Sequence, residues 1–227
     1  MRIDKSPLRQ QNTAHLIALR LWPAHRESPQ LVEKEQLVQE TDATCDVVKV
    51  PLISTAPRPS SSDSLRLGVL CNTKWNAAKL LLLTVRQLVD HGLRLESVNY
   101  YDKAHFYCNA DAESIAEIAS DNDIAITAIG DCAWSFSACI NDALHLERAG
   151  IPTVAFVTSE FEIEALLQRE LAGMPGLTPG VAEHPISSLT TEQLQRCAAK
   201  MASQARRIWF GADGALETAM FDAGASR

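Results

Sequence analysis

Hydrophobic and polar positions alternate with two different periods along most of this 227-residue chain. From residue 65 onward, short apolar runs typical of buried strands alternate with segments whose apolar residues recur at helical spacing. This alternation through short loops predicts an α/β domain, a three-layer parallel sheet that is flavodoxin-like or Rossmann-like in plan. The predicted strands cover 66–72, 95–103, 123–130, 153–158 and a short segment within 177–186, and the predicted helices cover 75–91, 112–120, 135–149, 161–172 and 190–211.

The first 54 residues do not follow this regular alternation. Strand-like segments at 15–22 and 45–53 flank a polar helix that begins at Ser28-Pro29, which predicts a small N-terminal β-α-β extension. Such a piece has little core of its own, so we expect it to pack on the main domain or on another subunit. Residues 55–64 are rich in Pro, Ser and Asp and are expected to form a linker that neither pairs as a strand nor buries apolar surface. The predicted organisation is an extension over 1–54, a linker over 55–64, an α/β domain over 65–212 and a tail over 213–227.

Charge and composition exclude several classes of partner. The formal net charge is −7, whereas a nucleic-acid surface needs clustered Lys and Arg. The longest apolar run is too short to span a bilayer, and the N-terminal MRIDKSPLRQQ lacks the apolar segment of a secretory signal. The six cysteines show no Cys-x-x-Cys spacing and are expected to be reduced thiols. We therefore expect a cytoplasmic protein with no nucleic-acid and no membrane partner.

Polar residues gather where the predicted strands end. Ligands of parallel α/β folds bind beyond the carboxyl ends of the strands, so residues at those ends are the first candidates for function. Nearly every strand of this sequence is followed by groups that can ionise or form hydrogen bonds, which predicts a site for a small-molecule substrate. These residues are Asn72, Thr73 and Lys74; Asp102, Lys103 and His105; Asp131 and Cys132; Thr158, Ser159 and Glu160; and Glu183 and His184.

Cys132 is the leading candidate for chemistry. It follows the third predicted strand and precedes a helix, whose N-terminal N–H groups and dipole stabilise a thiolate. Lys74 and Lys103 follow the first two strands, and a cation near the sulfur would lower its pKa further. The alternative is an ordinary buried cysteine, since free cysteine is among the most buried residue types. Asp131 either orients a substrate or accepts a proton, or it only caps the helix.

Other residues near Cys132 are candidates for binding or acid–base roles. Ser135 is expected at the mouth of the site, and Trp134 with Phe136 is expected to line a pocket or lid. His184 is either an acid–base residue or a solvated loop histidine. The turn after the first strand can hold an anion on its backbone amides, or it is an ordinary loop. The residues assigned to substrate binding are Asn72, Thr73, Lys103, Trp134, Ser135, Thr158 and Ser159.

For the remaining cysteines and for Asp142, a structural role is as strong an interpretation as a functional one, or a stronger one. Cys139 is expected in the core, and Asp142 is either a buried hydrogen-bond anchor or faces outward. Cys71 is expected in the strand core, although it could approach Cys132 if the first and third strands are neighbours. His105 and Cys108 show only weak metal-ligand spacing, so we assign no metal site.

Three stretches of the sequence resemble one known family. LGVLCNTKWNA (67–77), AIGDC (128–132) and INDALHLERAGIPTVAFVTSEF (140–161) are similar to the UGSC family of selenoproteins and their cysteine homologues. The resemblance extends from about Leu65 to Phe210 and leaves the N-terminal extension outside. It implies that Cys132 occupies the selenocysteine position, where a nucleophilic or redox-active atom is needed. It also implies that Asn72, Lys74 and Asp131 match the family's Asn, Lys and Asp.

The sequence departs from the family pattern directly after Cys132. Where the family reads Gly-Ser-Cys, this chain has Ala133-Trp134-Ser135, so it is a variant in which serine replaces the second cysteine. A redox cycle through that position cannot operate here. Either Cys71 or Cys139 resolves a disulfide instead, or Cys132 acts as a single nucleophile.

These observations predict an enzyme whose Cys132 thiolate acts on a small anionic substrate. Lys74 and Asn72 would hold the anion, and Asp131 or His184 would transfer protons. Thiol redox chemistry, as in an oxidoreductase, and cleavage of a carbon–heteroatom bond, as in a lyase or hydrolase, both stay open. The cofactor is unknown, and a reaction without a cofactor stays open. The protein could form a homodimer or associate with a partner subunit. Two other classes also stay open: a non-catalytic homologue that binds or stabilises a subunit, and a metal carrier using His105, Cys108 and Cys132.

Overall fold

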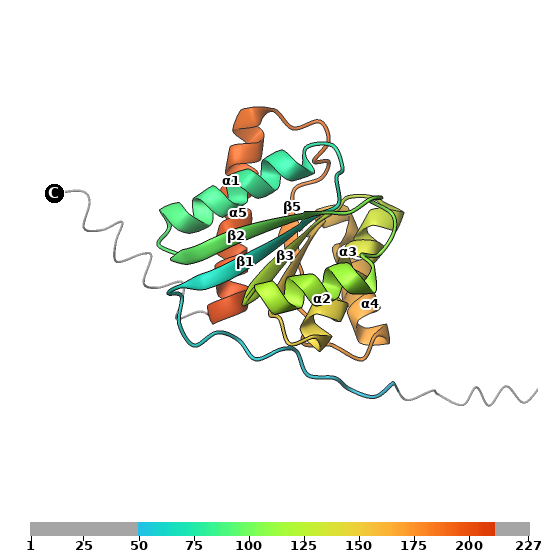
Figure 1. The fold of residues 1–227 in the computed structure, drawn as a ribbon. Helices are drawn as coiled ribbons and strands as arrows, with labels where there is room; N and C mark the ends of the chain where they lie inside the picture. Colours follow the sequence, from blue (N-terminus) through green and yellow to red (C-terminus); the bar gives the residue numbers. More distant parts are fainter. Residues whose placement is uncertain (1–49, 212–227) are drawn as a thin grey trace, which may run out of the picture. The chain divides into compact units, whose positions relative to one another are not determined.

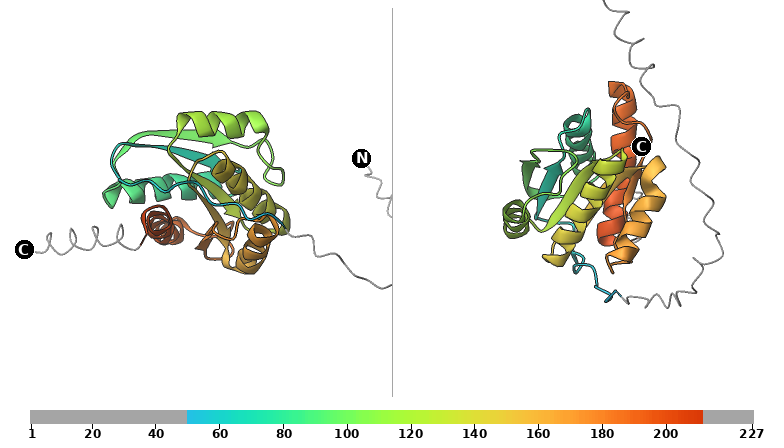
Figure 2. Two further views of the ribbon diagram at one scale, coloured as in Figure 1. Left: turned by 90° about the horizontal axis from the view of Figure 1, so that it is seen from below. Right: turned by 90° about the vertical axis from the view of Figure 1, so that its right-hand side faces the viewer.

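A computed structural model describes residues 50–211, which contain the whole of the predicted α/β alternation. A five-stranded parallel sheet lies between two layers of helices (Figures 1 and 2), so the predicted fold class is confirmed. The predicted elements at 15–22 and 28–40, most of 45–53 and the tail at 213–227 lie outside the described residues. Within the described part of the chain, no helix is long and apolar enough to cross a membrane.

Every strand and helix predicted from residue 65 onward is present, and the bounds differ by a few residues at most ends. The strands are β1 (Leu65–Cys71), β2 (Leu95–Asp102), β3 (Ile124–Gly130), β4 (Thr153–Thr158) and β5 (Gly180–Ala182). The helices are α1 (Ala77–Asp90), α2 (Ala112–Asp121), α3 (Ala133–Arg148), α4 (Glu162–Leu171) and α5 (Thr191–Phe210), with a short 3-10 helix at Ser159–Phe161.

Side-chain caps fix where two of the helices begin. The Asp111 carboxylate accepts the N–H of Ser114 at 2.7 Å and starts α2, as predicted. Thr190 and Gln193 exchange side-chain and backbone hydrogen bonds at the start of α5. Each such cap stabilises its helix by about 1 kcal/mol.

The strand order β2-β1-β3-β4-β5 is the flavodoxin-like order of parallel sheets. In the ladders, Cys71 pairs with both Asp102 and Ala128, and Thr158 pairs with Ala182. The carboxyl ends of neighbouring strands therefore meet at one edge of the sheet. The chain order reverses between β1 and β3, and that reversal point is where folds of this kind bind ligands.

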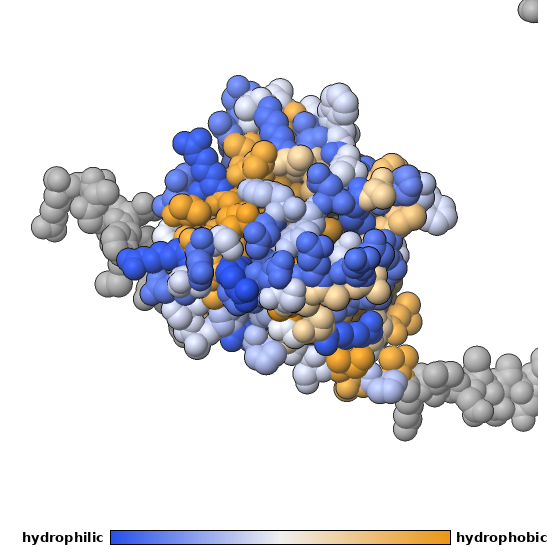
Figure 3. Space-filling view, in the orientation of Figure 1, coloured by the Kyte–Doolittle hydropathy of each residue, from blue (hydrophilic) through white to orange (hydrophobic). Residues whose placement is uncertain are grey.

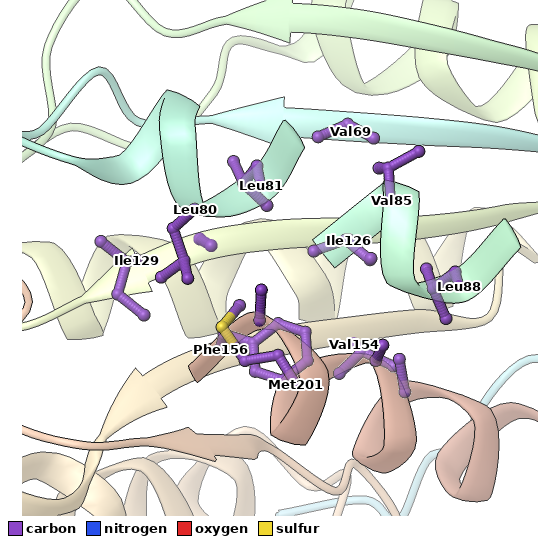
Figure 4. Packing of buried hydrophobic residues seen from close by; sticks show 14 of the residues in the cluster. Val69, Leu80, Leu81, Val85, Leu88, Ile126, Ile129, Val154, Phe156 and Met201 are labelled. Atoms are coloured by element: carbon purple, nitrogen blue, oxygen red, sulfur yellow. The ribbon is translucent and has the colours of Figure 1, made fainter. Parts of the chain in front are cut away.

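Apolar cores on both faces of the sheet hold the layers together. β3 lies in the middle of the sheet, and all seven of its residues are buried. Helices α1 and α5 cover one face of the sheet, and α2, α3 and α4 cover the other (Figure 2). Each fully buried large aliphatic side chain contributes about 1.5–3 kcal/mol to folding. The core under α1 and α5 includes the side chains labelled in Figure 4: Val69, Leu80, Leu81, Val85, Leu88, Ile126, Ile129, Val154, Phe156 and Met201.

The segment expected to be a free linker is tied to the α/β domain. It forms no strand, as predicted, but it does bury apolar surface at Ala56. The Ala56 N–H donates to Oε2 of Glu147 at 2.7 Å, and Arg58 forms an ion pair with Oε1 of the same side chain at 2.6 Å. Glu147 is buried at the end of α3 and also accepts the N–H of Thr153 at 2.8 Å. The buried carboxylate needs these donors, and they draw the segment onto the domain.

The surface over α1 is mixed in polarity. Figure 3 shows hydrophobic side chains in orange interrupted by hydrophilic ones in blue on this side of the molecule. Leu82 and Val89 of α1 are among the exposed apolar residues. Isolated apolar residues of this kind are ordinary on protein surfaces.

Candidate active site at the carboxyl ends of β1 and β3

Two neighbouring strand ends bring the central groups of the site together. β1 and β3 are hydrogen-bonded side by side, so the turns that follow them lie at the same edge of the sheet. The turn after β1 carries Asn72 and Lys74, and the turn after β3 carries Asp131 and Cys132. The site therefore lies at the reversal point of the strand order, where a parallel fold exposes backbone groups to a ligand.

Gly130 allows α3 to begin almost immediately after β3. A Cβ atom at this position would lie 2.6 Å from Cα of Phe136 and 2.9 Å from Cγ1 of Val157, which is too close for real side-chain atoms. Only Asp131 and Cys132 connect the strand to the helix. Cys132 is the N-cap residue of α3 and has extended backbone angles. Its side chain consequently lies at the positive end of the helix dipole.

The buried hydroxyl of Ser135 organises this connection. Its Oγ accepts the N–H groups of Asp131 and Cys132, each at 3.1 Å, and lies 3.2 Å from Sγ of Cys132. A hydroxyl has two acceptor lone pairs and one proton. Because the backbone N–H groups occupy both lone pairs, the hydroxyl is the donor and not the acceptor in its contact with the sulfur. Other acceptors for this proton, Oδ1 of Asp131 at 3.5 Å and the Cys132 carbonyl at 3.3 Å, lie farther away. The arrangement favours a thiolate over a thiol.

Lys74 brings a positive charge to the same place. Its ammonium forms an ion pair with the Asp131 carboxylate, and both side chains are largely buried. The Nζ atom also lies 5.2 Å from the centre of the Phe106 ring, a cation–π distance. Two contacts therefore hold the ammonium beside Cys132.

The pKa of Cys132 lies below the ordinary value for a thiol. Partial burial is the largest single influence and acts against this direction by raising the pKa. Hydrogen bonds to the sulfur from the side chain and N–H of Ser135, from Lys74 and from the N–H of Trp134 together outweigh it. Each of these donors stabilises the charged sulfur more than the neutral one.

Comparison with known proteins assigns the chain to a family. The sequence profile of the UGSC family matches residues 39–211. The chain belongs to the UGSC family. The match begins within the N-terminal extension, earlier than the Leu65 expected from the motifs. No curated protein matches the sequence of this UGSC-family member.

Solved structures similar to this UGSC-family member come from flavodoxin-like proteins. A diflavin flavoprotein A3 from Nostoc sp. is 12% identical, with 64% of this chain and 96% of that chain covered and a TM-score of 0.35. The flavodoxin-like domain of a Synechococcus sp. protein is 16% identical, with 63% and 99% covered and a TM-score of 0.31.

Asn72 and Thr73 are neighbours in the chain but differ in their exposure to solvent. Asn72 is buried and donates its side-chain amide to the carbonyl of Ile129 at 2.8 Å, which ties the end of β1 to β3. This hydrogen bond thus fixes the position of the turn after β1 relative to β3. Thr73 is exposed, with a left-handed backbone (φ 58°), and its N–H donates to Sγ of Cys71 at 3.3 Å.

Thr158 and His184 form a second polar group, at the ends of β4 and β5. Oγ1 of Thr158 lies 3.0 Å from Nδ1 of His184 and 3.4 Å from the carbonyl of Gly130. If the hydroxyl donates to that carbonyl, Nδ1 of His184 carries the proton and Nε2 is left as an acceptor. The His184 ring also meets Phe161, which stacks on Phe136 of α3. Ser159 lies exposed at the start of the 3-10 helix.

Lys103 does not serve as a cation for Cys132. Its ammonium is buried in an ion pair with Asp142 of α3, whose second oxygen accepts the N–H of Ala110 at 2.7 Å. The pair forms because Asp142, nearly inaccessible to solvent, needs a counter-charge. Of the two alternatives for Asp142, the buried anchor is therefore the one observed. Burial raises the pKa of Asp142 against the opposing charge of Lys103.

Cys71 and Cys139, the two candidates for a disulfide with Cys132, are both buried in the core. Cys71 is buried in the core under α1 and α5, and burial raises its pKa. Cys139 is buried on the other face, next to Thr127, and burial raises its pKa to about 12. Both residues therefore pack in the core, as the strand and helix patterns predicted. Cys108 is the exposed cysteine.

His105, Cys108 and Cys132 do not form a metal site. Within residues 50–211, no group of three or more His, Cys, Asp or Glu side chains converges as metal ligands would. Cys108 instead closes a turn, with its N–H donating to the carbonyl of His105 at 3.4 Å.

Two contributions to the site were not found by sequence reasoning. Phe106 contacts Lys74 from a loop after β2, and only its position in the apolar-aromatic stretch KAHFYC hinted at a role. Asn76 anchors the start of α1 by donating its side-chain amide to the carbonyl of Ile186 at 3.0 Å. Asn76 has a left-handed backbone (φ 66°). Asn tolerates this conformation, so the residue type was the one signal in the sequence for a turn at this position.

Proposed function

We propose that this UGSC-family protein is a cysteine-dependent enzyme in which the Cys132 thiolate attacks an electrophilic atom of a small anionic substrate. The observation that carries the proposal is the hydrogen-bond count at Ser135. Its lone pairs are engaged by backbone N–H groups, so its proton is available to Sγ of Cys132, which lies 3.2 Å away. A serine held in this way supports an ionised sulfur, and the thiolate is the nucleophilic form of cysteine.

The substrate's anionic group would be held by Lys74. An ammonium group has three donor hydrogens, and Lys74 donates one of them to an oxygen of Asp131. A second hydrogen serves the Cys132 sulfur, and the third can bind a carboxylate while the charge still stabilises the thiolate. The exposed Thr73 hydroxyl lies on the adjacent residue and donates to the Lys103 carbonyl at 3.4 Å, a long hydrogen bond that a substrate oxygen could replace.

Proton transfer would fall to Asp131 or to His184. Asp131 is the carboxylate next to the sulfur, and the Lys74 ammonium compensates its charge. His184 is exposed, and Thr158 holds it through Nδ1. The proposal covers thiol redox chemistry and cleavage of a carbon–heteroatom bond. The burial of Cys71 and Cys139 supports a single nucleophile.

Competitive alkylation tests the proposal. Full-length protein is treated with limiting iodoacetamide at neutral pH, and the rate at each cysteine is read from peptide masses. Cys108 is the internal reference, because it is exposed whereas Cys132 is only partly so. We expect Cys132 to react roughly tenfold faster than Cys108 despite its lower exposure. Equal rates, or a faster Cys108, would remove the activated thiolate and with it the proposed enzyme.

A further inference from the structure

Exposed aromatic side chains occur in the segments that carry the Cys132 site. Among residues 50–211, five Trp, Phe and Tyr residues are exposed, and four of them lie next to a site residue in the chain or in the loop that contacts Lys74. Trp75 follows Lys74 in the chain, and Trp134 is the second residue of α3 after Cys132. Phe106 meets the Lys74 ammonium, and Tyr107 packs edge-on against Phe106 with ring centres 5.2 Å apart. The fifth, Tyr100, lies within the edge strand β2.

These rings are not explained by packing of the domain. Trp75 is 76% exposed and Trp134 is 72% exposed, so each leaves most of an indole ring in water. The neighbouring helices bury other residues, such as Ala77 of α1 and Ala138 of α3. Phe106 and Tyr107 are in contact with each other, and exposed apolar surface beside fixed polar groups marks a candidate place for a ligand. Ligand sites typically combine aromatic walls with a few polar groups of fixed position, which is the combination found here.

We infer that these four rings are the walls of the substrate site and that the substrate is a planar anion, with an aromatic or conjugated body. The inference rests on the proposed function and adds the class of substrate. The contact between Lys74 and Phe106 places a cation at the face of a ring, so one ligand can meet both. The charged group of the ligand binds Lys74, and its planar body stacks on the rings while its electrophilic atom faces Cys132. A compact polar anion would use the cation and leave the indoles in water.

Four symmetrical disulfides probe this preference without knowledge of the natural reaction. Dithiobis(nitrobenzoate) is aromatic and anionic, dithiodipyridine is aromatic and neutral, dithiodipropionate is aliphatic and anionic, and hydroxyethyl disulfide is aliphatic and neutral. In each case the Cys132 thiolate attacks one sulfur, the S–S bond breaks, a mixed disulfide forms and the other half leaves as a thiolate. Each rate is divided by the rate of the same disulfide with glutathione, which removes differences in leaving-group reactivity. The protein carries Cys45→Ser and Cys108→Ser so that Cys132 is the accessible thiol.

We expect the normalised rate to be highest for dithiobis(nitrobenzoate). Trp75→Ala and Trp134→Ala should each reduce the advantage of the aromatic over the aliphatic disulfides roughly three- to tenfold. Lys74→Met should instead reduce the advantage of the anionic over the neutral ones. Tyr100→Ala is the matched control, because it removes an exposed ring away from the site, and it should leave all four rates unchanged.

Three results would overturn the inference. Equal normalised rates for the four disulfides would show that the rings do not select the substrate, while a fast Cys132 would leave the proposed function standing. A Cys132 no faster than glutathione with every disulfide would remove both. A change in oligomeric mass on Trp75→Ala or Trp134→Ala, with the aromatic advantage intact, would show that the rings belong to an interface between protein chains.

Discussion

The hydroxyl of Ser135 lies 3.2 Å from the sulfur of Cys132 and accepts the backbone N–H of that same residue at 3.1 Å. One side chain thereby caps a helix and supplies a hydrogen-bond donor to a thiolate. The two roles depend on each other, because the hydroxyl can donate to the sulfur only when its lone pairs face the backbone. The local fold of the strand-to-helix connection thus contributes to lowering the pKa of the cysteine.

Ser135→Ala should slow the alkylation of Cys132 by iodoacetamide at neutral pH roughly three- to tenfold. The thiolate reacts, and its fraction rises as the pH increases through the pKa. Loss of the hydroxyl removes one of the donors that lower the pKa of Cys132, so the rise in rate should move to higher pH. The measurement is the alkylation rate at Cys132 between acidic and alkaline pH.

Ser137→Ala is the control for this experiment. Ser137 lies in the same helix but is not among the groups that lower the pKa of Cys132. Its replacement should leave the pH profile in place. An unchanged profile for Ser135→Ala as well would contradict the role assigned to the hydroxyl.

Lys74→Met should also move the alkylation profile of Cys132 to higher pH, because an ammonium that favours the thiolate is replaced by a neutral chain of similar length. Lys74→Arg, which keeps the charge, should restore most of the rate. The two profiles are compared with that of Lys79→Met, an exposed lysine of α1 that pairs with Thr191. A Lys74→Arg variant as slow as Lys74→Met would show that packing, and not charge, explains the loss.

Asp142→Asn should destabilise the protein by about 3–5 kcal/mol, since it leaves the Lys103 ammonium buried without a counter-charge. Urea unfolding measures the loss. The control is Glu183→Gln, which breaks the exposed pair with Lys200 and should cost about 1 kcal/mol or less. The alkylation profile of Cys132 should stay unchanged in folded Asp142→Asn protein, because Lys103 belongs to the core and not to the site. Similar stability losses for the two variants would contradict the buried pair.

The order of strands and helices could be predicted from the sequence because each element carries its own period. β3 reads as an unbroken apolar run and is buried throughout, and Gly150 ends the helical pattern of α3. The position of Cys132 at the start of α3 followed from that order alone. Local sequence therefore placed the sulfur at the edge of the sheet.

Pairings between distant residues could not be predicted in the same way. Lys74 and Lys103 each follow a strand, and nothing local indicates that the first faces Asp131 and the second Asp142. That choice depends on where the turns after β1 and β2 lie relative to the turn after β3 and to α3 in the folded chain. The ion pair between Arg58 and Glu147 could not be predicted from local sequence either, because it joins residues 89 positions apart. The role of Phe106 likewise became visible only through its contact with Lys74.

Gly130→Ala should destabilise the protein by about 1–3 kcal/mol, because the new methyl group would overlap the backbone of Phe136 and force α3 away from β3. Gly176→Ala is the control, since the nearest atom to its added Cβ is a methyl of Thr55 at 3.3 Å. Urea unfolding of both variants gives the comparison.

The same substitution separates the two supports of the Cys132 thiolate. Ser135 lies in α3 with Cys132 and would move with it, whereas Lys74 follows β1 and would stay behind. Folded Gly130→Ala protein should therefore show an alkylation profile of Cys132 that is moved to higher pH. Adding Lys74→Met to Gly130→Ala should slow Cys132 little further, because the contact that it removes is already lost. Additive effects of the two substitutions would mean that Gly130 does not set the distance between α3 and Lys74.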